Sequence, residues 1–189
     1  MGGRMTGVKD QTTGDYLQAL ASTSAVPGGG SAAALAAAMG AALVSMVAKL
    51  SAKKARADEG RAALTDLVPE LDRLADRLLE LSQDDIDAYR AVIDARKSGT
   101  GGTALERAYE RAADVPLATA SAAARGLALA AEASKNAWDM TASDLAVGSK
   151  LLQTGLDGAL ANVAINLPEL RGEPASRIER AYRELMAKA

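Results

Sequence analysis

The chain has 189 residues, and 49% of them are apolar, which is enough to build the core of one ordinary domain. Its 22 basic and 24 acidic residues leave a net charge of -2, so neither nucleic acid nor a membrane is expected as a partner. The sequence contains no histidine and no cysteine, which excludes a Ser-His triad, a thiolate nucleophile, a disulfide framework and the usual zinc sites. Acid and base chemistry therefore depends on Asp, Glu, Lys or Tyr.

The N-terminal residues lack the apolar core of a secretory signal, which predicts a cytoplasmic location. The uncharged stretch at residues 32–48 is rich in alanine. It is shorter than the roughly 20 strongly apolar residues that a membrane span needs. A membrane-spanning segment is therefore not expected.

Alanine and leucine dominate the sequence, and apolar residues recur at intervals of three and four, which predicts helices throughout and no strand. A short first helix at residues 14–22 is capped by Thr12 or Thr13. Ser31 follows three glycines as the natural N-cap of a second helix through residue 52, whose small residues let another backbone approach closely. A third helix occupies residues 60–97, with a possible kink at Pro69.

The fourth predicted helix covers residues 103–134, and the fifth covers 143–170, with Ser143 as its cap and Asp144 against its dipole. A short final helix at 177–186 follows Pro174. There is no internal repeat and no long linker. The expected fold is an all-α, single-domain bundle of five to six helices over residues 1–189, with residues 1–12 flexible.

One carboxylate on the third helix interrupts an apolar stripe. Asp85 lies four residues after Leu81 and four before Tyr89, on the face predicted to pack inward. A carboxylate in apolar surroundings has a raised pKa and can both accept and give a proton. A buried Asp held by hydrogen bonds from a neighbouring helix is the structural alternative. The stripe consists of Leu67, Leu71, Leu74, Leu78, Leu81, Tyr89 and Val92, and the opposite polar face consists of Glu80, Gln83, Asp84, Asp87, Arg90 and Asp94.

Two further patterns could bind a ligand. The loop PGGGS at residues 27–31 places free N–H groups at the start of a helix, which suits an anionic or carbonyl group, although three glycines before a helix more often form a tight entry turn. On the fifth helix, two asparagines among apolar residues need a partner from another helix or from a polar ligand. They extend a small, polar face that contains Asp144, Gly148, Gly155, Gly158, Asn162 and Asn166.

Five segments, taken in order, resemble one family. They are AVPGGGSAAALAAAMGAALVSMVAKLS at 25–51, DIDAY at 85–89, AADVPL at 112–117, SDL at 143–145 and NVAINL at 162–167. Their order and spacing are similar to those of the cyclodeaminase/cyclohydrolase family. That family includes the C-terminal domain of formiminotransferase-cyclodeaminase and free-standing bacterial methenyltetrahydrofolate cyclohydrolases. The resemblance covers nearly the whole chain.

The resemblance implies a helical fold that forms a homodimer, with a folate site between the subunits. It implies Asp85 as the proton acceptor, with Asp87 next to it in the pattern. Family members commonly carry Gly-Asn before SDL, whereas this chain has Lys135-Asn136, a departure that puts the detailed role of Asn136 in question. The implied substrate-binding residues are Gly28, Gly29, Gly30, Ser31, Asn136, Asp144, Asn162 and Asn166.

The expected function is an enzyme of one-carbon folate metabolism. It would interconvert 5-formimino- or 10-formyltetrahydrofolate with 5,10-methenyltetrahydrofolate, with ammonia or water as the leaving group, and the sequence does not choose between the two. No metal and no redox cofactor are expected. A folate-binding protein without turnover and a plain helical dimerisation module are the alternatives.

Overall fold

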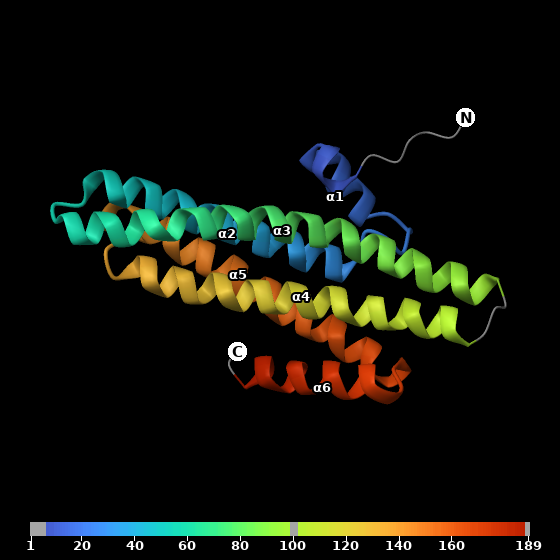
Figure 1. The fold of residues 1–189 in the computed structure, drawn as a ribbon. Coiled ribbons are helices and arrows are strands. Elements are labelled where there is room, and N and C mark those ends of the chain that lie inside the picture. Colours follow the sequence, from blue (N-terminus) through green and yellow to red (C-terminus); the bar gives the residue numbers. More distant parts are fainter. Residues whose placement is uncertain (1–6, 99–101, 188–189) are drawn as a thin grey trace.

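The computed structural model describes residues 7–98 and 102–187. Four long helices form an antiparallel bundle in which each packs against the next along the chain and the last returns to the first (Figure 1). The described residues contain no strand, and the predicted all-α class is confirmed. The four helices are α2 (Gly29–Lys54), α3 (Asp58–Lys97), α4 (Thr103–Ser134) and α5 (Ala142–Asn166).

Short elements flank this bundle, and Figure 1 shows α1 and α6 on opposite sides of it. The helix α6 begins five residues earlier than predicted, with Pro174 in its first turn. Its Ile178 is buried, and its Arg177 donates to the carboxylate of Asp114 on α4 at 2.8 Å. The short elements are η1 (Val8–Asp10), α1 (Thr13–Leu20), η2 (Asp139–Thr141), η3 (Leu167–Glu169) and α6 (Gly172–Met186).

The N-terminal segment differs from the flexible segment expected at residues 1–12. Residues 1–6 lie outside the described residues. Val8 is buried at 6% exposure, and its N–H donates to the Gln83 side chain on α3 at 2.9 Å. The segment that follows is capped as expected, because the Thr12 hydroxyl accepts a hydrogen bond from the Asp15 N–H at 3.1 Å.

Two predicted helix caps are wrong. Ser31 lies inside the first turn of α2, where Gly28 occupies the N-cap position. The Ser31 hydroxyl instead contacts the hydroxyls of Tyr16 at 3.0 Å and Ser82 at 2.8 Å, which satisfies it in a buried position. Ser143 is likewise inside α5, and Thr141 precedes that helix without a side-chain cap.

The predicted helix at 143–170 ends earlier, at Asn166. Pro168 lacks the N–H that would continue the α-helical hydrogen-bond pattern, and the chain tightens into η3 over Leu167–Glu169. The fourth helix has the predicted bounds, and Pro69 lies inside α3.

Small residues hold α2 against α5. A Cβ on Gly155 would lie 2.5 Å from the Ala37 Cβ, and one on Gly40 would lie 2.7 Å from the Gly148 carbonyl oxygen. Larger side chains would separate the two backbones. The helix α2 is long and apolar enough to span a membrane by length and composition alone, but 61% of its most apolar stretch is buried inside the bundle.

Candidate functional site

A cavity of about 330 Å³ lies where α2 begins. Its size is at the lower end of the range of small-ligand sites. Its walls come from the loop before α2, the C-terminal half of α3, the N-terminal half of α4 and the end of α5. Among the residues that line the cavity are Gly28, Gly29, Gly30, Asp85, Tyr89, Val92, Arg96, Tyr109, Asn162, Ile165, Asn166 and Glu169.

Asp85 points into this cavity, as the apolar stripe predicted, and it rests against the backbone of Gly30. A Cβ on Gly30 would lie only 2.1 Å from Oδ1 of Asp85. A Cβ on Gly29 would meet nothing closer than the Asn162 amide nitrogen, at 3.7 Å. The third glycine of the loop therefore makes room for the carboxylate, a role that the loop pattern alone did not reveal.

The carboxylate of Asp85 also takes the place of a helix cap. The first intrahelical bond of α2 runs from the Ala32 N–H to the Gly28 carbonyl at 3.0 Å, so the preceding N–H groups lie outside the hydrogen-bonded repeat. Desolvation by burial raises the pKa of Asp85, and a hydrogen bond from the Ser31 backbone N–H acts in the opposite direction. Desolvation is the larger effect, which gives a carboxylate poised to exchange a proton.

A chain of buried hydroxyls lies behind Ser31. Besides its contact with the Ser31 hydroxyl, Ser82 donates to the Ser31 carbonyl at 3.0 Å. Tyr16 of α1 joins the chain from the other side and is 4% exposed. These bonds tie the first turn of α2 to α3 and so fix the N–H that contacts Asp85. Ser82 lies three residues before Asp85, a spacing that could have identified it as a supporting residue.

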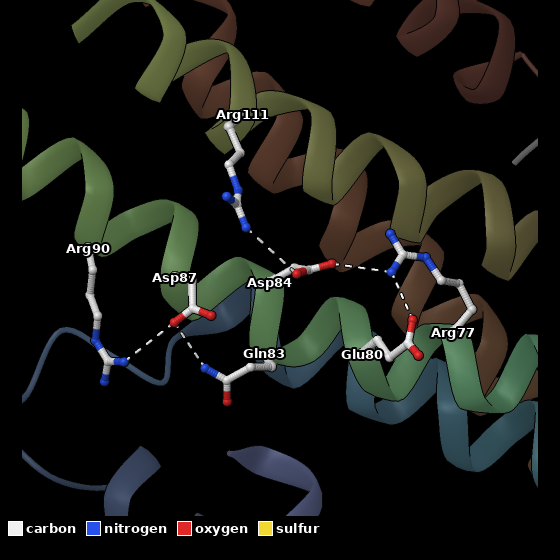
Figure 2. Close-up of polar contacts among 7 residues, drawn as sticks. All are labelled: Arg77, Glu80, Gln83, Asp84, Asp87, Arg90 and Arg111. Carbon is white, nitrogen blue, oxygen red and sulfur yellow. Dashed lines mark hydrogen bonds and ion pairs between the residues drawn. The ribbon is translucent and has the colours of Figure 1, made fainter. Parts of the chain in front are cut away.

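The acidic neighbours of Asp85 point away from the cavity, as predicted. Figure 2 shows Asp84 between two arginines of different helices, Arg77 at 3.3 Å and Arg111 at 3.8 Å. Asp87 accepts from the Gln83 side chain at 3.0 Å and pairs with Arg90 at 3.6 Å (Figure 2). Both carboxylates are held in surface networks, which distinguishes them from Asp85.

The two asparagines of α5 line the cavity next to the glycine loop. The Asn162 amide N–H donates to the Gly158 carbonyl at 2.8 Å, and that of Asn166 donates to the Ala112 and Asn162 carbonyls at 2.9 Å each. Their amide nitrogens are engaged by the protein backbone. The side-chain carbonyl oxygens remain as acceptors for a ligand.

Asn136 and Asp144 do not join this site within one chain. Asn136 lies at the opposite end of the bundle, where its Oδ1 would be 3.0 Å from a Cβ on Gly60. Asp144 precedes Asn162 by 18 residues of one helix, or about 27 Å. A family pattern does not reveal which end of a long helix each motif occupies, so the role of Asn136 and Asp144 in a site shared by two subunits stays a prediction.

Three cavity residues were missed as binding candidates. Tyr89 was predicted to pack inward but is 41% exposed and lines the cavity. Arg96 and Tyr109 line it too, and the Arg96 guanidinium donates to the Tyr109 hydroxyl. Arg96 lies eleven residues after Asp85, on the same face of α3, and this spacing could have identified it.

Comparison with known proteins gives the family. A model of the formiminotransferase-cyclodeaminase family matches residues 12–183. The chain belongs to this family. Across the described residues, no group of three or more His, Cys, Asp or Glu side chains could hold a metal ion.

Two relatives of the chain differ in how much of their own length it covers. The chain is 32% identical over 165 residues to the methenyltetrahydrofolate cyclohydrolase of Methylorubrum extorquens, and covers 79% of that protein. It is 33% identical over 163 residues to the formimidoyltransferase-cyclodeaminase of Sus scrofa, and spans only 30% of its length.

A solved structure has the same fold. The formiminotetrahydrofolate cyclodeaminase of Thermotoga maritima aligns with a TM-score of 0.88 over 96% of this chain and 91% of its own. The sequence identity of the pair is 24%.

Proposed function

We propose that the protein is an enzyme of one-carbon folate metabolism that forms or opens the methenyl bridge of tetrahydrofolate. The observation that carries this proposal is the carboxylate of Asp85, desolvated against Gly30 and facing a cavity next to the free N–H groups of α2. Membership of the formiminotransferase-cyclodeaminase family supports the substrate class.

The chemistry needs one group that accepts and then returns a proton. In the cyclodeaminase reaction, N10 attacks the carbon of the protonated formimino group, Asp85 accepts the N10 proton, and the departing –NH2 group takes that proton up and leaves as ammonia, which leaves the methenyl cation. In the cyclohydrolase reaction, water attacks the methenyl carbon and Asp85 accepts one water proton, which N5 receives as the carbon–N5 bond breaks. The remaining hydroxyl proton is released to solvent as the formyl C=O forms. Neither reaction changes an oxidation state, so we propose that it uses no redox cofactor, and that no metal ion takes part.

The remaining cavity groups orient the substrate. The side-chain carbonyls of Asn162 and Asn166 can accept hydrogen bonds from the N–H groups of the pterin ring. The free N–H groups at the N-terminus of α2 can donate hydrogen bonds to a carbonyl oxygen of the substrate. Positioning of this kind accounts for much of the rate that a small catalytic set can achieve.

The decisive test replaces Asp85 and compares it with a matched neighbour. Asp85→Asn should lower kcat by about 10²–10⁴-fold, the usual contribution of a general acid or base, measured by the methenyl absorbance. Asp84→Asn, on the same helix but paired with surface arginines, should keep most of the activity. Unchanged turnover in Asp85→Asn would remove this residue from the mechanism.

The rates of reaction with the two substrates show whether ammonia or water is the leaving group. The purified protein is offered 5-formiminotetrahydrofolate and 5,10-methenyltetrahydrofolate, and ammonia release and methenyl loss are measured separately. A much higher kcat/KM for one substrate identifies the physiological reaction. Calorimetric binding without turnover of either substrate would identify a folate-binding protein instead.

We also infer a homodimer formed through an apolar face of α2 and α5. Met39 is 51% exposed, Met46 37% and Leu50 38%, and with Leu43 they recur at intervals of four, three and four residues. Val147 on α5 is 50% exposed next to this stripe, since Leu43 lies against Gly148. Exposed apolar faces of this kind mark interfaces between proteins.

Sedimentation equilibrium tests the dimer. The wild-type protein should sediment as a dimer at micromolar concentration, and Met39→Glu should shift it toward the monomer. Leu17→Glu, at an exposed position on α1, is the matched control and should leave the dimer intact. A monomeric wild-type protein would contradict the inference.

A cytoplasmic location without a membrane partner remains our proposal. It rests on the net charge of -2 and on the burial of 61% of the apolar stretch of α2 inside the bundle. Recovery of the protein in the membrane fraction after cell lysis would contradict it.

A further inference from the structure

One wall of the cavity is a single face of α3. Asp85, Tyr89, Val92 and Arg96 follow one another at four, three and four residues, and all four line the cavity. Asp85 and Arg96 are eleven residues apart, which is close to three full turns and about 16 Å along the axis. The wall therefore presents a carboxylate, an aromatic ring, an apolar side chain and a guanidinium in that order.

Arg96 is the only basic side chain among the described residues that line the cavity. Its guanidinium donates to the Tyr109 hydroxyl and lies 5.4 Å from the centre of that ring. Arg125 and Arg177, by contrast, are bound by carboxylates of another helix at 2.7 and 2.8 Å. No described carboxylate, including Glu169 in the same cavity, pairs with Arg96 in this way. Its charge is positioned without being neutralised.

The order of groups on α3 matches the order of groups in a folate. From the one-carbon bridge, a folate continues through its aminobenzoyl ring to the carboxylates of its glutamate, a span of roughly 10 Å at ordinary bond lengths. Helical side chains lean toward the N-terminus of their helix. From a backbone spacing of about 16 Å, the long side chain of Arg96 can therefore reach back along α3 toward the cavity.

We propose that α3 binds the substrate lengthwise and that Arg96 holds a carboxylate of its glutamate through charge-assisted hydrogen bonds. Tyr89 contacts the aminobenzoyl ring, with the exposed Ile165 of α5 in the same cavity. The pterin ring then lies on the other side of Asp85, next to the glycine loop and Asn162. This assignment rests on the proposed function and adds to it the orientation of the substrate and a residue that selects for the glutamate.

The test compares two substrates that differ only in the glutamate. They are 5,10-methenyltetrahydrofolate and 5,10-methenyltetrahydropteroate, which lacks that residue. In Arg96→Gln, KM for the folate should rise about tenfold while kcat changes much less, so the KM ratio between the two substrates shrinks by about the same factor. Arg96→Lys keeps the charge without the planar fork and should restore part of the ratio.

Arg90→Gln is the matched control. Arg90 lies on the same helix, pairs with Asp87 at 3.6 Å and does not line the cavity, so its loss should leave the KM ratio unchanged. An Arg96→Gln ratio equal to that of the wild type, or an equal rise of KM for both substrates, would overturn the assignment of Arg96.

The assignment and the proposed function can fail separately. If the wild-type protein binds both methenyl compounds but turns over neither, the enzymatic proposal fails. The ratio of the two Kd values, measured by calorimetry in wild type and Arg96→Gln, then tests Arg96 alone. No binding of either compound would overturn both proposals.

Discussion

At the end of the bundle where α2 begins, the Asp85 carboxylate faces an open cavity, whereas at the opposite end the Ser51 hydroxyl is enclosed by the α4–α5 connection. The Ser51 hydroxyl accepts the Trp138 N–H at 2.9 Å and contacts the Thr141 hydroxyl at 3.4 Å. Thr141 in turn donates to the Trp138 carbonyl at 2.7 Å. Buried polar groups at this closed end satisfy one another, while those at the cavity end keep acceptors for a ligand.

Buried polar groups have different roles at the two ends of the bundle. Hydrogen bonds in which donor and acceptor both belong to the protein stabilise the fold, and removing one of the two groups leaves the other unsatisfied. Polar atoms that face a cavity contribute to binding or catalysis. Substitutions at the two ends should therefore affect different measurements.

After Asp85→Asn, the largest expected effect is at Gly30. In Gly30→Ala the new Cβ would lie 2.1 Å from Oδ1 of Asp85, so the carboxylate must move. A displacement of about 1 Å can cost 100-fold in rate, and kcat/KM should fall by at least that order. Gly29→Ala is the control, because its Cβ would be 3.7 Å from the Asn162 amide nitrogen, and it should lose much less. Wild-type kcat/KM in Gly30→Ala would contradict the close approach.

Substitutions at the closed end should change the free energy of unfolding. Ser51→Ala leaves the part-buried Trp138 N–H without its acceptor, which should lower the free energy of unfolding by about 1–3 kcal/mol, measured by urea denaturation. Ser176→Ala, at an exposed position on α6, should change it by less than about 0.5 kcal/mol. Activity per folded molecule should be retained in Ser51→Ala, and its loss would break the distinction between the two ends.

Two of the three candidate asparagines allow a direct comparison of the ends. Asn162→Ala removes an acceptor from the cavity, and kcat/KM should fall about tenfold, the effect of about 1.4 kcal/mol. Asn136→Ala, at the closed end, should stay within about twofold of wild type, because its side chain is exposed and lies far from the cavity. Equal losses would mean that the cavity assignment is incomplete.

Asp144→Asn extends this comparison to the dimer. Within one chain Asp144 is about 27 Å from Asn162 along α5, so the substitution should leave kcat/KM nearly unchanged. A loss comparable to that of Asn162→Ala would show that a second copy brings Asp144 to the site.

The smallest expected effect is on the pH dependence of stability. Desolvation raises the pKa of Asp85 above its unfolded value, so the folded protein binds this proton more tightly. The stability that this proton provides is present at low pH and is lost as the pH rises through the folded pKa. Above that pKa the wild type carries a buried charge that Asp85→Asn lacks.

Asp85→Asn should therefore have the higher Tm at pH 8, by roughly 2–4 °C for about 1 kcal/mol in a domain of this size. The advantage should shrink as the pH falls toward 4, which scanning calorimetry at several pH values would measure. Asp84→Asn should show no such gain at pH 8. A pH-independent difference for Asp85→Asn would contradict the buried charge.

Local sequence patterns predicted the helices and the inward position of Asp85, since both depend on periodicity along one helix. The second helix begins at Gly29, before the expected cap, because the Ser31 hydroxyl is engaged by Tyr16 and Ser82 from other elements. Such tertiary partners leave no signal in a local pattern. For the same reason the role of Gly30, which depends on a residue 55 positions further along the chain, became visible only in the fold.

The candidate site was predicted in part. The glycine loop, Asp85, Asn162 and Asn166 converge, because antiparallel helices bring the start of α2 to the end of α5. Asn136 and Asp144 do not, since the sequence does not state how far along the bundle a residue lies. Arg96 was overlooked because a single arginine near a helix end usually reads as a solvated residue.

The hydrogen bond between the Ser31 N–H and Asp85 also offers a spectroscopic reporter. The chemical shift of this amide proton should follow the charge on the carboxylate, so a nuclear magnetic resonance titration of one backbone signal would follow the protonation of Asp85 without substrate. The chain contains no histidine, the side chain that ordinarily titrates between pH 5 and 8. A transition of the Ser31 signal in that range would be free of the histidine background that complicates such measurements in most enzymes.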